Sequence, residues 1–355
     1  MAIPVDSEAP MSPFSGLPGA LWLYRFDAAG HAQVLDARQC GIDAVQAGAD
    51  HWHWLHLDLS DARSAQVVAK LPLPEDAGAT LLSPDSHVNL QLEDEAVHGV
   101  FVDWTHQRGV DLAAEGQLRG DDGIGWLHFA LTPTLLVTAR RQALRSVEAA
   151  RRAVGKGVIA DSPVRLLELI AGRFADTVER SSDGLSVRLD RIEDRVLADS
   201  IGEERRDLAQ LRHQTVRLHR PLTAMRRVLK QFEQRHPADT EHELLPAVSR
   251  LNQRFDDLDG DVGTLQERAR LLQDEVAAKL AERTNRHLYV LSMITALLLP
   301  PSLVAGLFGM NLPGLPFAHS THGLAFALLL GVASSVVVYL ALRRVGVSRS
   351  TWAYA

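Results

Sequence analysis

The stretch that decides the fold is residues 287–311, which read HLYVLSMITALLLPPSLVAGLFGMN. No Lys, Arg, Asp or Glu occurs between His287 and Gly309, and none occurs in a second apolar run from Gly323 to Leu342. At about 1.5 Å per helical residue, each run reaches the ~30 Å of a bilayer core. Two transmembrane helices are therefore expected at 287–309 and 323–342, within a membrane domain at 286–342 whose two spans are joined by a loop at 310–322.

Basic residues flank both runs on one side only. Three precede the first run and three follow the second: Lys279, Arg283, Arg286, Arg343, Arg344 and Arg349. The loop 310–322 contains neither Lys nor Arg. Since basic flanks stay on the cytoplasmic side of a membrane, both termini, including the tail 343–355, are expected in the cytoplasm and the loop outside.

The rest of the chain carries the charge. The net charge is -7, and all 44 acidic residues lie at or before Glu282, which excludes a basic footprint for nucleic acid. The single cysteine, Cys40, excludes an internal disulfide and suits a reducing compartment. Residues 1–18 form a Pro-rich tail without the apolar core of a secretory signal. No Walker A, G-x-G-x-x-G or G-x-S-x-G motif occurs, so no enzyme is expected.

Residues 19–160 predict a cytosolic α/β or α+β domain. Strand-like segments are expected at 21–27, 52–59, 88–95, 97–104, 125–131 and 134–139, with helical stretches at 61–71 and 142–154 between them. The run His51-Trp52-His53-Trp54-Leu55-His56 places two histidines on one face of a strand and the third on the other. No Cys completes a zinc-ligand set, so we expect surface histidines rather than a metal site.

Residues 161–285 predict very long antiparallel helices. A seam with alternating spacings of four and three comprises Leu244, Val248, Leu251, Phe255, Leu258, Val262, Leu265, Ala269, Leu272 and Val276. A second seam comprises Leu208, Leu211, Thr215, Leu218, Leu222, Met225, Leu229 and Phe232. A turn at 236–239 separates the two, and an earlier helix opens at Ser162-Pro163. No strong helix breaker intervenes between Pro246 and Pro300, so one helix of about 60 residues, ~90 Å, is expected to run into the first span.

The face of this long helix opposite the seam is small and acidic. It comprises Asp256, Gly260, Gly263, Glu267, Asp274, Ala278 and Ala281. A solvated outer face would explain the acids, but glycine destabilises a helix unless close approach is needed. We therefore expect this face to turn toward a symmetry axis, where Asp256, Glu267 and Asp274 would concentrate cations.

One face of the first span is polar. At about 100° per residue, a stripe roughly 100° wide contains Asn285, Leu288, Ser292, Thr295, Leu299, Ser302 and Gly306. The apolar residues Val290, Met293, Ile294 and Leu297 lie outside it. Two interpretations are open. The hydroxyls bond to their own helix or pack helix pairs, or they line a pore in which Leu288 and Leu299 form apolar gates. Two spans cannot enclose a polar path, so a pore requires several copies around an axis.

The end of the first span, Pro300-Pro301-Ser302-Leu303-Val304-Ala305-Gly306-Leu307-Phe308-Gly309-Met310-Asn311, resembles the signature of the CorA superfamily of divalent metal-ion transporters. In that family a Gly-Met-Asn triplet ends the pore-lining helix. Magnesium transporters of the family usually have an acidic residue just beyond the triplet, as in a Met-Pro-Glu sequence, whereas this loop has no acid. It resembles the zinc-transporting ZntB branch, as does the stretch 125–141, although Pro313 departs from the Gly more common there.

The resemblance implies a funnel-shaped homopentamer in the bilayer of the bacterial inner membrane, with Gly309, Met310 and Asn311 as the selectivity filter. It implies transport of Zn²⁺, with Ni²⁺, Cd²⁺ and Co²⁺ as further candidate cargoes, coupled to protons and without a cofactor. Amide oxygens of Asn311 suit hydrated cations, and a capping role for Asn311 is compatible. His319 and His322 are candidate loop sites for metal or protons. A Mg²⁺/Co²⁺ channel of the same fold and a non-transporting, membrane-tethered coiled-coil sensor are the alternatives.

Overall fold

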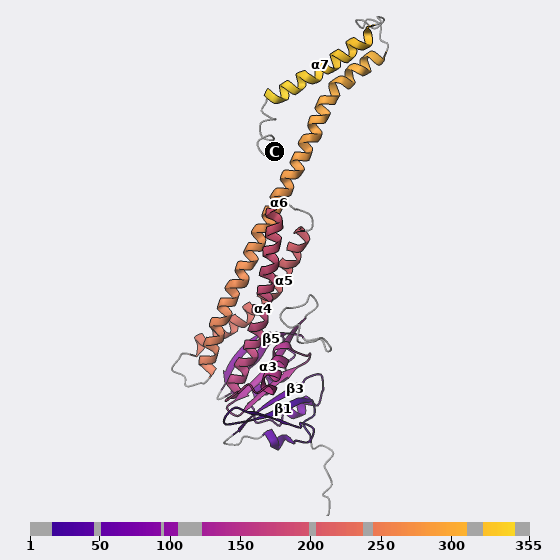
Figure 1. The fold of residues 1–355 in the computed structure, drawn as a ribbon. Coiled ribbons are helices and arrows are strands. Elements are labelled where there is room, and N and C mark those ends of the chain that lie inside the picture. Colours follow the sequence, from indigo (N-terminus) through magenta and orange to yellow (C-terminus); the bar gives the residue numbers. More distant parts are fainter. Residues whose placement is uncertain are drawn as a thin grey trace, which may run out of the picture. The chain divides into compact units, whose positions relative to one another are not determined.

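The computed structural model describes residues 16–45, 51–93, 96–105, 123–198, 204–236, 244–310 and 322–344. The chain divides into two compact units, Met1–Gln273 and Asp274–Ala355, and one long helix contributes residues to both. Figure 1 follows the chain from the sheet of the first unit to the helix pair of the second.

Seven strands form one mixed sheet in the first unit, in the order β2-β1-β3-β7-β6-β5-β4. They are β1 Ala20–Asp27, β2 Ala32–Leu35, β3 His51–Asp58, β4 Asn89–Glu93, β5 Ala96–Trp104, β6 Ile124–Thr132 and β7 Leu135–Arg140. Within this sheet β3 and β7 pair parallel, and the other neighbours pair antiparallel. The six segments expected from the sequence are confirmed as strands, whereas β2 was missed.

Helices cover both faces of the sheet. On one face, η1 Ile42–Val45, α1 Ser64–Val68 and α2 Glu75–Leu82 bury their apolar residues against Leu55 and Val137. On the other face lie α3 Arg145–Gly155 and the start of α4 Pro163–Leu197, where Phe174 stacks on Trp104 with ring centroids 4.5 Å apart. The helix expected at 61–71 is present but shorter, as α1, and the sequence did not predict α2.

Two of the three histidines of β3, His53 and His56, are buried, so the expectation of surface histidines was wrong for these two. His53 is 1% and His56 0% exposed. His56 Nδ1 lies 2.8 Å from the Thr138 hydroxyl, Trp54 Nε1 donates to the same hydroxyl over 2.8 Å, and the Trp22 ring stacks on His56 at 4.1 Å. Because both faces of the sheet are covered, every residue of β3 except its two ends is buried. Among the described residues, no group of three or more His, Cys, Asp or Glu side chains could hold a metal ion.

The helix α4 begins as the sequence predicts. Ser162 accepts a hydrogen bond on its side chain from the Arg165 main-chain nitrogen over 3.3 Å, and Pro163 occupies the first turn. Such a cap satisfies one of the free amide groups at a helix start. The cap thus fixes where α4 begins, and further along the helix Phe174 stacks on Trp104 of the sheet.

Three helices pack together in the first unit: α4, α5 Glu204–Arg235 and the first part of α6 Leu244–Gly309 (Figure 1). Both predicted seams are buried, and the seam of α6 is nowhere more than 7% exposed. Thr223 donates to Asp259 over 3.0 Å, and Asn252 donates to Glu233 over 2.8 Å. Since residue numbers rise along α5 as they fall along α6, these contacts confirm the antiparallel pair. The turn expected at 236–239 lies outside the described residues from 237 onward.

The long helix is continuous, as expected. α6 comprises 66 residues and passes through Pro300 and Pro301 before it ends at Gly309. The next described helix, α7, occupies Gly323–Arg344. The proline pair lies in the last turns of α6, where each proline removes one main-chain donor from the helix.

Candidate functional site

In the second unit, α7 packs against one side of α6. The Ser335 hydroxyl donates to the main-chain oxygen of Leu297 over 3.0 Å. A Cβ added to Gly331 would lie 3.6 Å from the Cβ of Pro301, so the small residue permits close approach of the two helices. The rings of Phe308 and Phe326 lie 6.4 Å apart near the other end of the contact.

The polar stripe lies on the opposite side of α6. Its members, Asn285, Leu288, Ser292, Thr295, Leu299, Ser302 and Gly306, are all exposed in the single chain. By contrast, Met293, Leu297, Pro301, Val304 and Phe308 are partly buried. At about 100° per residue, these two sets lie on opposite sides of the helix. The stripe is therefore not the surface on which α7 packs.

Two of the three stripe hydroxyls, those of Thr295 and Ser302, are bonded to their own helix. Thr295 donates to the Leu291 oxygen over 2.9 Å, and Ser302 donates to the Leu299 oxygen over 2.8 Å. This matches the first interpretation of these residues. A hydroxyl that donates in this way keeps its own oxygen as an acceptor, so the stripe still presents oxygen atoms away from α7.

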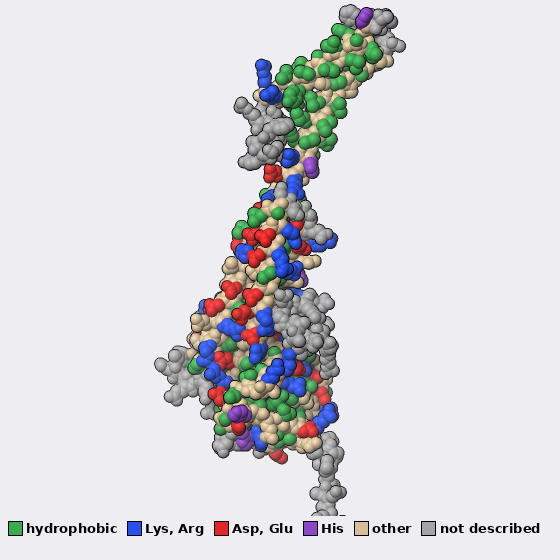
Figure 2. Space-filling view, viewed as in Figure 1, with side chains coloured by type: hydrophobic (Ala, Val, Ile, Leu, Met, Phe, Trp, Pro, Cys, Tyr) green, Lys and Arg blue, Asp and Glu red, His purple; other side chains and the backbone are tan. Residues whose placement is uncertain are grey.

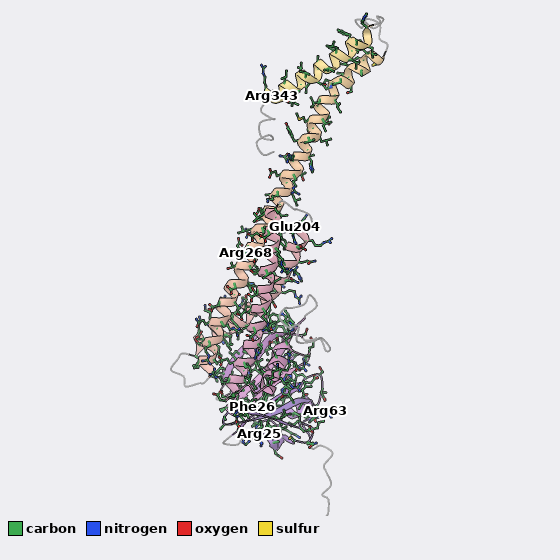
Figure 3. All side chains as sticks on the ribbon, in the orientation of Figure 1. Arg25, Phe26, Arg63, Glu204, Arg268 and Arg343 are labelled. Atoms are coloured by element: carbon green, nitrogen blue, oxygen red, sulfur yellow. The ribbon has the colours of Figure 1, made fainter. Side chains whose placement is uncertain are left out.

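The second unit exposes a large apolar surface. Hydrophobic side chains cover the visible face of α7 and of the adjoining part of α6 (Figure 2), and Leu298, Leu324 and Leu329 are between 62% and 76% exposed. Soluble monomers rarely expose apolar patches of this extent. Both helices are long and apolar enough to cross a membrane, and the apolar window of each is at most 6% buried. The basic pair Arg343 and Arg344 ends α7 (Figure 3).

The expected filter lies at the end of α6. Gly309 is the last helical residue, and Met310 after it is 63% exposed. His322 is exposed directly before α7 begins. Asn311 and His319 lie outside the described residues, so their roles stay predictions from the sequence.

The three acids expected to attract cations, Asp256, Glu267 and Asp274, differ in their surroundings in the structure. Asp256 pairs with Arg226 of α5 over 2.8 Å, and the same Arg226 nitrogen lies 3.5 Å from Asp259. Glu267 is 59% exposed, with its closest ion-pair partner, Arg270, 4.0 Å away. Asp274 is exposed as well. Glu267 and Asp274 therefore remain the stronger candidates for attracting cations, and sequence spacing alone gave no sign of the pairing of Asp256.

Gly260 and Gly263, on the small and acidic face of α6, have no packing reason among the residues that the structure describes. A Cβ added to Gly260 or Gly263 would meet no atom within 4 Å. Glycine destabilises a helix interior by about 1 kcal/mol relative to alanine. Close approach of another molecule is the remaining structural reason for glycine at these positions.

Comparison with known proteins gives a consistent picture. A family model described as "CorA-like Mg2+ transporter protein" matches residues 49–344. The zinc transport protein ZntB of Pectobacterium atrosepticum is 27% identical over 290 residues, which cover 78% of this chain and 82% of that protein. The divalent cation transporter CmaX of Pseudomonas aeruginosa is 32% identical over 190 residues, which cover 51% of this chain and 54% of that protein.

The fold has a solved counterpart. The structure of the full-length CmaX protein superposes with a TM-score of 0.74 at 22% sequence identity, and the match covers 92% of this chain and 97% of that one. The matched fold thus includes the sheet, the long helices and the two apolar helices described above.

Proposed function

This chain belongs to the family of CorA-like Mg²⁺ transporter proteins, and we propose that it moves divalent metal cations across a membrane, with Zn²⁺ as the favoured cargo. The names of the relatives support this choice, because one is a zinc transport protein and another a divalent cation transporter. Neither name describes an enzyme.

The observation that carries the proposal is the open polar stripe of α6. Its hydroxyls and Asn285 lie opposite α7, and no other described helix of the second unit faces them. Polar groups turned toward lipid are costly. If several copies of the chain surround an axis, the stripes instead face one another and enclose a path for ions. A homopentamer, as the family resemblance implies, is the assembly we propose.

Within such a pore, Leu288 and Leu299 supply the apolar constrictions, and Gly309, Met310 and Asn311 form the filter at its outer end. Leu299 is 60% and Leu288 56% exposed in the single chain, which leaves both free to meet copies of themselves. Rings of leucine can close a pore by excluding water. Amide oxygens at Asn311 would contact the water shell of the cation.

Proton coupling is the second part of the proposal. The loop 310–322 has no carboxylate to attract a dication but contains His319 and His322, and imidazole can bind Zn²⁺ or carry a proton. The alternative is a Mg²⁺ or Co²⁺ channel that needs no proton, and the family description names Mg²⁺. The two differ in cargo and in their response to pH.

We place the protein in the bacterial inner membrane, with the start of the first span and the end of the second span on the cytoplasmic side. Support comes from the basic residues at these ends, Arg283 and Arg286 before the first span and Arg343 and Arg344 after the second. Basic flanks of membrane helices stay in the cytoplasm.

Flux measurements test the proposal. The full chain is reconstituted in liposomes, and uptake of radioactive Zn²⁺ is followed with and without an acidic outer solution. We expect uptake above that of protein-free liposomes and faster uptake when the outside is acidic. Uptake of Mg²⁺ without any pH response would support the channel instead, and no flux of Zn²⁺, Co²⁺ or Mg²⁺ would support the sensor.

A further inference from the structure

A cavity of about 560 Å³ opens in the first unit between α4, the first part of α6 and the segment 158–161. Its lining includes four arginines, Arg165, Arg173, Arg250 and Arg254, against three carboxylates. The volume falls in the range of roughly 300–1,000 Å³ that is common for small-molecule sites. All residues that line the cavity belong to the first unit, whereas the stripe and the expected filter belong to the second.

Two of the carboxylates are each shared by two arginines. Glu168 accepts one hydrogen bond from Arg165 over 2.9 Å and two from Arg250 over 2.7 and 2.8 Å. Burial raises the pKa of Glu168, but the bonds from Arg250 and Arg165 outweigh burial and hold it below its usual value. The carboxylate is therefore charged at neutral pH, and one negative charge faces two positive ones.

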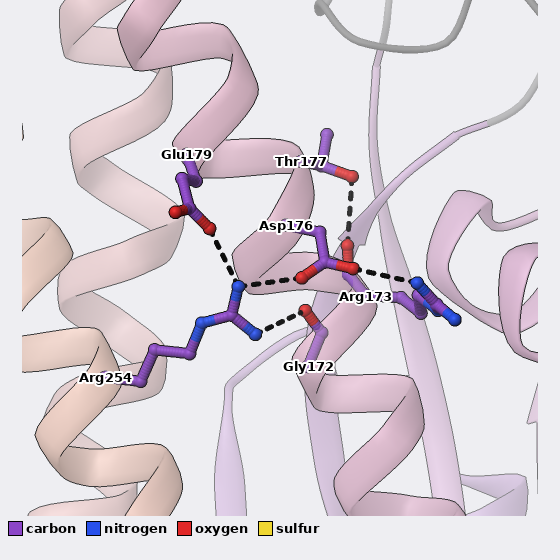
Figure 4. Close-up of polar contacts among 6 residues, drawn as sticks. All are labelled: Gly172, Arg173, Asp176, Thr177, Glu179 and Arg254. Carbon is purple, nitrogen blue, oxygen red and sulfur yellow. Dashed lines mark hydrogen bonds and ion pairs between the residues drawn. The ribbon is translucent and has the colours of Figure 1, made fainter.

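Asp176, further along α4, is likewise shared by two arginines (Figure 4). It accepts from Arg173 over 3.0 Å and from Arg254 over 2.7 Å, and Arg254 also reaches Glu179 over 2.8 Å. The third carboxylate of the lining, Asp161, lies at the exposed edge. The lining thus carries four arginines and three carboxylates, and Glu179 beside the lining pairs with Arg254 as a fourth carboxylate.

The arginines have more donors than the carboxylates can accept. Each guanidinium has five N–H groups, and Arg165 uses one of its terminal nitrogens for Glu168. The Nε atom of Arg173 is buried and has no hydrogen-bond partner among the described residues. With five N–H groups on each of four arginines, the cavity lining has donors left for an added acceptor group.

Apolar residues also line the cavity. Val158 and Ile159 are 38% and 59% exposed, and Leu169 and Leu251 lie beside them in the lining. The segment is held in place because the Ala160 nitrogen donates to the Gly30 oxygen over 3.1 Å. Gly30 has φ 81°, and a Cβ there would come within 2.7 Å of the Ala160 main chain. The apolar wall is therefore fixed before any ligand arrives.

We propose that this cavity binds a small phosphorylated ligand of the nucleotide class. Guanidinium groups match phosphate oxygens in a two-pronged geometry and are the preferred phosphate partners in proteins. The phosphates would lie on Arg165 and Arg250, and the base would cover Ile159 and Leu169. A nucleotide bound in this way would bridge α4 and α6, and its recognition does not depend on which cation the chain transports.

Binding is tested on the purified full chain in detergent, without divalent cations, by calorimetric titration with ATP, pyrophosphate and adenosine. We expect ATP to bind at least tenfold more tightly than pyrophosphate or adenosine, because only ATP has both phosphates for the arginines and a base for the apolar residues. Absence of saturable ATP binding would overturn the site. Equal affinity for ATP and pyrophosphate would overturn the nucleotide class, and equal affinity for ATP and adenosine would overturn the role of the arginines.

Two variants of one ion pair distinguish binding from folding. Arg165→Gln should weaken ATP binding about tenfold, whereas Glu168→Gln should tighten it, because the second change frees Arg165 and Arg250 for phosphate. Both changes break the same ion pair, so a folding defect would move both affinities in the same direction. Weaker binding by Glu168→Gln would contradict the proposal.

Arg268→Gln is the matched control. Arg268 joins α6 to α4 as Arg250 does, but it reaches two carboxylates, Asp190 over 2.8 Å and Glu193 over 2.9 Å, and lies outside the cavity lining (Figure 3). Its replacement should leave ATP affinity unchanged. A loss equal to that of Arg165→Gln would mean that ATP responds to overall charge, and the site would be rejected.

Discussion

The Ser335 hydroxyl of α7 lies 3.0 Å from the main-chain oxygen of Leu297 in α6 and donates a hydrogen bond to it. In a regular α-helix this oxygen would accept from the main-chain nitrogen four residues later, which here belongs to Pro301 and has no hydrogen. Ser335 thus replaces the donor that the proline removes. Main-chain groups in a bilayer must form their hydrogen bonds within the protein. The main-chain oxygen that Pro301 leaves without a donor therefore depends on α7 for its hydrogen bond. This contact fixes α7 on the side of α6 away from the stripe.

Removal of the filter amide is the first prediction. We expect Asn311→Ala to abolish cation flux and to leave the oligomer intact, because assembly depends on the helices rather than on this residue. Flux in proteoliposomes and the mass of the detergent-solubilised oligomer are the two measurements. Unchanged Zn²⁺ uptake by a correctly assembled variant would remove Asn311 from the filter.

The gate can be tested with two adjacent leucines. Leu299 and Leu298 are 60% and 62% exposed in the single chain, but only Leu299 belongs to the stripe. We expect Leu299→Ser to raise basal flux severalfold, since a hydroxyl lowers the barrier to wetting of an apolar constriction. Leu298→Ser is the control and should leave basal flux near that of the parent. Equal effects of both changes would mean that stripe position does not matter.

How far the sequence could predict the molecule depends on how local each signal is. The seams of α5 and α6, the cap at Ser162 and the two apolar helices follow from periodicity and composition within one segment, and the structure confirms them. The strand β2 has only four residues, none of them buried, and therefore left no alternation to detect.

The buried histidines and the paired acid depend on distant partners instead. His56 is held by Thr138, and Asp256 by Arg226. In each case the partner comes from another element, so the sequence placed His56 at the surface and Asp256 on a face turned toward a symmetry axis. The shared carboxylates at Glu168 and Asp176 escaped notice for the same reason, since their second arginines come from α6.

Proton coupling gives the third prediction. Acidifying the outer solution should stimulate Zn²⁺ uptake, and the double change His319→Ala with His322→Ala should flatten this response, because imidazole is the titratable group nearest the outer end of the spans. Uptake is measured across a series of outer pH values at constant inner pH. A pH response that survives in the double variant would clear the histidines and direct attention to Glu267 and Asp274.

The stability of the first unit should depend on pH through His53. Burial, followed by the nearby charges of His51 and Arg25, lowers the pKa of His53 to about 4. The unfolded chain binds a proton near pH 6.5, so stability is lost as the pH falls from about 6.5 toward about 4. The melting temperature, followed by tryptophan fluorescence, should therefore fall less steeply over this range for His53→Gln than for the parent.

The exposed His213 supplies the control for this prediction. His213→Gln should leave the slope of melting temperature against pH unchanged. If both variants flatten the slope equally, the pH dependence does not arise from burial of His53.

The central claim is that the stripe of α6 lines a water-filled path for cations. In a chain without its own cysteine, made by Cys40→Ser, one thiol is placed at Ser292 on the stripe or at Ile294, which is 49% exposed but lies off the stripe. Zn²⁺ flux through proteoliposomes is then measured before and after a charged, water-soluble thiol reagent. The account predicts that the reagent blocks flux through Ser292→Cys and spares Ile294→Cys. Flux that persists in Ser292→Cys after complete labelling, or an equal block of both variants, would contradict it.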